Sequence, residues 1–176
     1  GSGILNSKIT NRENVETEMG KAKFYWKEIP LTKELDTKNL NIKILDKLNR
    51  ELIGGIAINI GNPHLIFFLE NIDSYDLAKI GPKLEKHEYF PERCNVTFAK
   101  IINKKTIQVK VWERGAGLTK ACGTAACATA VAAQKAGLSD RHVNIKFSQG
   151  YLSVFIDKNN LIRMNGPVSN IEKIKI

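Results

Sequence analysis

The stretch "VWERGAGLTKACGTAACATAVAAQKAGL", residues 111–138, contains a helix that decides the fold and a cysteine at the start of that helix. Residues 121–136 include eight alanines and no charged residue before Lys135, and Gly137 follows as a stop signal. A helix that is apolar on every side belongs in a protein interior. We therefore predict an α/β (α+β) domain, in which a mixed, mostly antiparallel sheet curls around this buried alanine-rich central helix.

The strands of this sheet are predicted by short runs in which apolar and polar residues alternate. These runs are residues 39–46, 55–60, 64–70, 94–102, 106–113, 142–148, 151–157 and 160–166. Several of the turns between them are short enough for hairpins, which favours antiparallel pairing, and the last three strands should form a meander.

A second helix is predicted over residues 73–87, where Leu77, Ile80 and Leu84 have helical spacing. Asp73 or Ser74 would cap its start. Gly81-Pro82 predicts a kink or break, because proline removes a helix hydrogen bond.

Composition limits the classes of protein that remain. The chain has 176 residues, of which 43% are hydrophobic, with no signal peptide or membrane-length apolar window, so we expect a cytoplasmic domain that does not bind membranes. Three cysteines without C-x-x-C spacing and three scattered histidines predict neither disulfides nor a metal site. The net charge of +9 is spread along the chain, which disfavours nucleic-acid binding, although a non-catalytic basic binding domain stays an alternative.

The cysteine at the helix start suggests chemistry. Cys122, Gly123 and Thr124 would form the first turn, where free N–H groups and the helix dipole favour anions and should lower the pKa of the thiol. Two residues at the end of a strand add further binding groups. The Glu113 carboxylate can bind an amine, and the Arg114 guanidinium can bind a carboxylate through two N–H groups. Together these groups suit an amino-acid substrate. The competing interpretation of Cys122 is simple packing, and we expect that role for Cys94 and Cys127.

Polar residues at two strand entrances complete the candidate site. Asn62 and His64 flank Pro63 between two apolar strands, and Asn95 begins another strand. Such positions either meet a ligand or cap a turn, so both interpretations stay open.

Three motifs in this order resemble the C-terminal half of diaminopimelate epimerases: "GNPH" at 61–64, "FPERCNV" at 90–96 and "WERGAGLTKACGTAACA" at 112–128. The resemblance implies a cofactor-independent isomerase of lysine and peptidoglycan precursor biosynthesis. In this reaction one cysteine removes the α-proton of diaminopimelate and a second, on the opposite face, returns one. The L,L and meso forms are thereby interconverted.

By this resemblance Cys122 is one of the two bases, Glu113 partners a catalytic thiol and helps to hold the substrate amine, and His64 assists the opposite thiol. The implied substrate-binding positions are Asn62, Asn95, Glu113, Arg114, Gly123 and Thr124. Leu118 and Ala125 depart from the commonest family pattern, which bears on recognition of the distal group. Another cofactor-free amino-acid racemase, such as a relative of proline racemase, is the alternative.

The resemblance also implies a partner that this sequence does not contain: an N-terminal domain with its own cysteine loop. We therefore expect residues 1–18 to be a tag remnant and a linker or strand from that missing domain. Residues 19–176 would be the C-terminal domain. A full-length protein would be a homodimer, and the isolated half should be inactive or nearly so because one face of the substrate has no base.

Overall fold

The computed structural model describes residues 5–11, 14–46 and 48–168. Its two helices are α1 (Leu77–Glu85) and α2 (Gly123–Lys135). Its strands are β1 (Ser7–Asn11), β2 (Asn14–Gly20), β3 (Ile42–Leu45), β4 (Glu51–Gly54), β5 (Ile56–Asn59), β6 (Pro63–Phe68), β7 (Asn95–Asn103), β8 (Thr106–Glu113), β9 (Gly117–Thr119), β10 (His142–Phe147), β11 (Gly150–Ile156) and β12 (Ile162–Pro167).

Most of the strands within these residues belong to one sheet, in the order β1-β2-β12-β11-β10-β8-β7-β6-β5, and β9 pairs with β8. The pairs β6/β7 and β10/β8 are parallel and the others are antiparallel, so the prediction of a mixed, mostly antiparallel sheet is confirmed. The meander of β10, β11 and β12 is also confirmed. A separate hairpin joins β3 to β4.

Side-chain alternation divides the apolar residues into two cores. In β8, Ile107, Val109 and Val111 pack in the same core as the alanines of α2. In β6, Ile66 joins this core, whereas Leu65 and Phe67 pack with α1 in the second core. Because β6 is covered on both faces, its sequence is a continuous apolar run.

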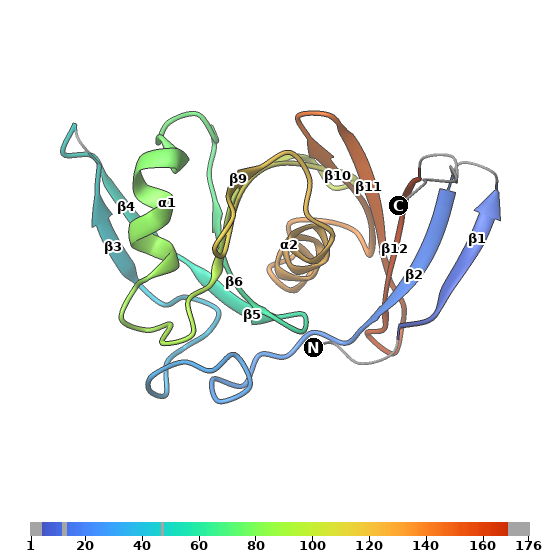
Figure 1. Cartoon of the computed structure of the whole chain (residues 1–176), viewed down its shortest axis with the longest axis horizontal. Helices are drawn as coiled ribbons and strands as arrows, with labels where there is room; N and C mark the ends of the chain where they lie inside the picture. The colour runs from blue at the N-terminus through green and yellow to red at the C-terminus, as the bar shows by residue number, and fades with distance from the viewer. Residues whose placement is uncertain (1–4, 12–13, 47, 169–176) are drawn as a thin grey trace, which may run out of the picture.

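The two helices differ in their surroundings. Nine consecutive residues of α2, Ala125 to Ala133, are buried, and α2 contacts strands β5, β6, β7, β10, β11 and β12. Figure 1 shows α2 end-on among these strands, with α1 and the β3–β4 hairpin to one side. Neither helix in the described part of the chain is long and apolar enough to cross a membrane.

Two details of the predicted second helix are wrong. It begins later, because Asp76, rather than Asp73 or Ser74, is the N-cap and accepts a hydrogen bond from the Ala78 amide. Of the kink or break predicted at Gly81-Pro82, the break is wrong, because the helix continues through Pro82 to Glu85. Burial of Leu77, Ile80 and Leu84 against the sheet holds the helix together despite the hydrogen bond that proline removes.

The chain before residue 20 contributes to the sheet. β2 is hydrogen-bonded along β12, with Met164 opposite Thr17, and β1 pairs with β2 at the exposed edge. Residues 1–4, which include the predicted tag remnant, and residues 169–176 lie outside the described residues.

Candidate active site

Strand register brings three predicted site residues to one end of the sheet. His64 and Asn95 are register partners in the parallel pair β6/β7, and β8 ends beside them because it runs antiparallel to β7. Side chains alternate between the two faces of a strand, so residues an even number of positions apart share a face. His64 therefore lies on the same face as Ile66, Asn95 on the same face as Ala99, and Glu113 on the same face as Val111. All three therefore lie on the α2 side of the sheet.

Cys122 is the N-cap of α2, and the helix begins at Gly123. Its side chain is buried but not sealed, with 8% of the residue exposed. The thiol sulfur lies 3.5 Å from the hydroxyl of Thr124. That hydroxyl accepts a 3.4 Å hydrogen bond from Nδ2 of Asn62, which links the loop before β6 to the start of α2.

The prediction that the helix start lowers the pKa of Cys122 is wrong. Burial is the largest influence and raises this pKa. The Thr124 hydroxyl and the Ala125 amide oppose that effect, whereas the nearby Glu113 carboxylate raises the pKa further by its charge and by a hydrogen bond. Cys122 is therefore a protonated thiol at neutral pH, with a carboxylate beside it that can accept its proton.

His64 is a neutral, fully buried side chain. Burial and the positive charge of Arg114 lower its pKa to about 3. Its Nε2 atom lies 2.9 Å from Oδ1 of Asn62. With Oδ1 as the acceptor, Nε2 carries the hydrogen and Nδ1 is an acceptor, which has no hydrogen-bond partner among the described residues.

Asn95 joins two of the motifs. Its Nδ2 donates to the carbonyl of Pro63 (3.0 Å), and its Oδ1 accepts from the backbone N–H of Arg114 (3.0 Å). The guanidinium of Arg114 donates to the carbonyl of Glu92 (2.9 Å). The three segments that were predicted to form the site are thus connected by direct hydrogen bonds.

Two further residues, Glu85 and Met164, reach this region and were not predicted. Glu85 of α1 accepts hydrogen bonds from Trp112 and Gly115, on either side of the Glu113-Arg114 pair. Met164 of β12 occupies the space beside Gly123, since a Cβ there would lie 3.0 Å from its terminal methyl. No local pattern signals these contacts, because each residue comes from an element distant in sequence.

The other cysteines have no access to the site. Cys94 and Cys127 are fully buried, and burial raises the pKa of both thiols, that of Cys127 to about 12. Over the described ranges, no group of three or more His, Cys, Asp and Glu side chains is arranged to hold a metal ion.

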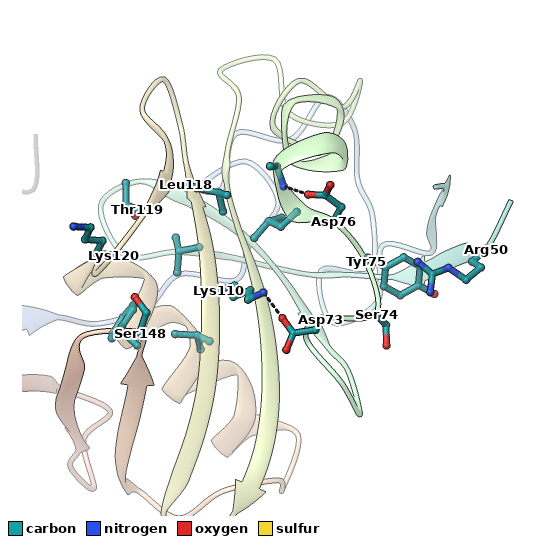
Figure 2. Close-up of a pocket in the computed structure, with 15 residues that line it drawn as sticks. Arg50, Asp73, Ser74, Tyr75, Asp76, Lys110, Leu118, Thr119, Lys120 and Ser148 are labelled. Atoms are coloured by element: carbon teal, nitrogen blue, oxygen red, sulfur yellow. Dashed lines mark hydrogen bonds and ion pairs between the residues drawn. The ribbon is translucent and has the colours of Figure 1, made fainter. Parts of the chain in front are cut away.

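A separate hollow of about 550 Å³ is lined by residues of β8, β9 and the start of α1. Figure 2 shows Asp73 paired with Lys110 at its wall and Arg50 beside the ring of Tyr75. Leu118 lines this hollow, but Cys122, Glu113 and His64 do not. It is therefore distinct from the candidate active site.

The family model and the relatives that match this chain all point to the same family. The diaminopimelate epimerase family matches residues 56–171. The chain is 59% identical over 175 residues to diaminopimelate epimerase from Pelagibacter ubique (strain HTCC1062), covering 99% of this chain and 64% of that protein. It is 42% identical to a diaminopimelate epimerase from Methylorubrum extorquens, covering 95% of this chain and 57% of the relative. The chain thus spans about three fifths of the length of these relatives.

Solved structures support the fold alone. A predicted epimerase from Pseudomonas aeruginosa superposes with a TM-score of 0.61 at 14% identity, covering 98% of this chain and 63% of that one. A hydroxyproline epimerase from Agrobacterium vitis superposes with a TM-score of 0.59 at 12% identity, covering 88% of this chain and 50% of that one. The sequence match over residues 56–171, together with the 59% identity, shows that the chain belongs to the diaminopimelate epimerase family.

Proposed function

We propose that this chain is the C-terminal catalytic part of a cofactor-independent epimerase that interconverts L,L- and meso-diaminopimelate. The observation that carries the proposal is the Cys122 thiol at the start of α2 with the Glu113 carboxylate beside it. Residues 19–176 would form the domain proper, with the sheet curled around α2 as its central helix. Residues 5–11 and 14–18 extend the sheet at one edge.

The proposed chemistry starts from the N-terminus of α2. The substrate carboxylate binds the free backbone N–H groups of the first turn, where the helix dipole stabilises the negative charge that develops when the α-proton leaves. Gly123 and Thr124 belong to that turn. Arg114 adds positive charge and Asn62 and Asn95 supply amide groups around the substrate.

The protonation states suggest a direction for each step. A protonated Cys122 gives its proton to the α-carbanion and becomes a thiolate, which the helix start stabilises. In the reverse direction, Glu113 first takes the thiol proton, and the thiolate then removes the α-proton. Each step moves one proton and changes no oxidation state, so the reaction needs no redox cofactor.

A second thiol must act on the opposite face of the substrate. Cys94 and Cys127 are fully buried, so neither of them meets this need. We infer that it comes from the part of the protein that the longer relatives contain and this chain does not match. The family resemblance assigns His64 to assist such a thiol. Its Nδ1 atom has no hydrogen-bond partner among the described residues but is fully buried, so the thiol can reach it only if the packing over His64 opens.

The test is to join this chain to the unmatched part of the Pelagibacter ubique relative and to follow L,L-diaminopimelate by chiral chromatography. The joined protein should convert it to the meso form, and Cys122→Ala should abolish conversion while the protein stays folded. The 176-residue chain alone should give little or no conversion. Conversion at full enzyme rate by the chain alone, or preferred conversion of L-proline or trans-4-hydroxy-L-proline, would contradict the proposal.

A further inference from the structure

We propose that Glu85 is a positioning residue that holds the Glu113-Arg114 pair against the start of α2, an inference that rests on the proposed function. Glu85 is the last residue of α1, and only 4% of it is exposed. A carboxylate at this place is unfavourable for two reasons: it is buried, and it lies at the negative end of the helix dipole. Its partners must therefore compensate for a substantial cost.

The partners of Glu85 flank the two candidate site residues. Oε2 accepts a hydrogen bond from Nε1 of Trp112 at 2.7 Å, and Oε1 accepts one from the backbone N–H of Gly115 at 3.1 Å. Trp112 directly precedes Glu113, and Gly115 directly follows Arg114. One carboxylate thus contacts both ends of the dipeptide. Among the described residues its one other polar contact is the ion pair with Arg93, at 3.8 Å.

The packing of the Trp112 ring restricts movement of the loop segment that Glu85 binds. The ring packs closely against α1, because a Cβ on Gly81 would lie 2.7 Å from the ring, and it also lies beside Gly117 of β9. Alternation along β8 directs Trp112 towards α1 and Glu113 towards α2. The hydrogen bond from Trp112 to Glu85 therefore fixes how the end of β8 is rotated about the strand axis. That rotation directs the Glu113 side chain towards Cys122.

The thiol of Cys122 reports the position of Glu113 without any need for turnover. The Glu113 carboxylate raises the pKa of Cys122, whereas Glu85 is not among the groups that shift it. A change at Glu85 should therefore alter the Cys122 titration only by moving Glu113. Cys94 and Cys127 stay unreactive in the same experiment, because both are fully buried.

The experiment measures the pH dependence of iodoacetamide alkylation of the 176-residue chain. Fragment-ion mass spectrometry separates Cys122 from Cys127 within one tryptic peptide. Glu113→Gln and Glu85→Gln should each lower the pKa of Cys122 by about half a unit or more, which is about a threefold change in thiolate fraction. The double variant should match Glu113→Gln alone, because both changes act through one carboxylate.

Glu88→Gln is the matched control: it removes an exposed carboxylate three residues further along and should leave the titration unchanged. If Glu85→Gln does not fold by circular dichroism, Trp112→Phe removes one of the two donors, keeps an aromatic ring and should give a smaller shift in the same direction. A folded Glu85→Gln with the wild-type titration, or shifts of Glu85→Gln and Glu113→Gln that add, would overturn the proposal. An inactive joined enzyme with these thiol shifts intact would count against the epimerase activity and not against Glu85.

Discussion

Gly81 in α1 offers a sharp test of the packing that supports the site. An added Cβ would lie 2.7 Å from Cδ2 and 2.8 Å from Cγ of Trp112, atoms next to the attachment point of the ring. These atoms move little without moving the backbone of β8. The ring is also held by its hydrogen bond to Glu85, so it has little freedom to tilt away.

The expected cost of Gly81→Ala follows from two opposing effects. Overpacking of this kind costs about 2–3 kcal/mol when the neighbour cannot yield, and replacing a helical glycine by alanine returns about 1 kcal/mol. The free energy of unfolding should therefore fall by about 1–2 kcal/mol, which lowers the melting temperature by about 2–8 °C in a chain of this size.

Urea unfolding followed by circular dichroism measures this change, and a second background separates the two effects. In Trp112→Leu the obstructing ring is absent, so Gly81→Ala should there be neutral or stabilising by up to about 1 kcal/mol. Equal destabilisation in both backgrounds, or a stabilised Gly81→Ala in the wild-type background, would refute the packing argument.

Three further predictions concern the caps and the buried titratable groups. Asp76→Ala should lower the free energy of unfolding by about 1 kcal/mol and Asp73→Ala by clearly less, because only Asp76 caps α1; equal losses in urea melts would contradict this. The pKa of His64 falls from 6.5 to about 3 on folding, so below pH 6.5 the unfolded chain binds a proton that the folded one does not. The free energy of unfolding should thus fall as the pH decreases from 6.5 towards 3, by up to about 1.4 kcal/mol per pH unit. A folded His64→Gln variant should lose this part of the pH dependence. An unchanged pH dependence in that variant would show that another group causes it. Cys122→Ser should keep its fold by circular dichroism yet abolish epimerisation by the joined protein, and a variant with near-wild-type turnover would exclude a catalytic thiol.

The alternating strands and both helices were predictable because each carries its own periodic signal. β1 and β2 were not predicted as strands of this sheet, because polar residues dominate them and β1 is wholly exposed. β9 is only three residues long, too short for a pattern. The parallel pairing of β6 with β7 depends on the α1 crossover rather than on a local turn.

The candidate site was predictable at the level of residue type and less so at the level of its electrostatics. Cys122 at a helix start and Glu113 at a strand end follow from local patterns. The raised pKa of the thiol does not, because burial is a property of the assembled core and here outweighs the hydrogen bonds from Thr124 and the Ala125 amide, which lower that pKa. Glu85 was hidden for a related reason: within the sequence it belongs to the helix, and only the tertiary fold brings it to the loop.

The central claim is that Cys122 serves one face of the substrate, and solvent deuterium exchange tests it most directly. In D2O the joined protein should incorporate deuterium at the α-carbon of both the L,L and the meso isomer. Cys122→Ala should stop inversion and restrict exchange to the one isomer whose α-proton faces the remaining thiol. Continued inversion, or exchange into both isomers by this variant, would show that the proton at that face is moved by another group.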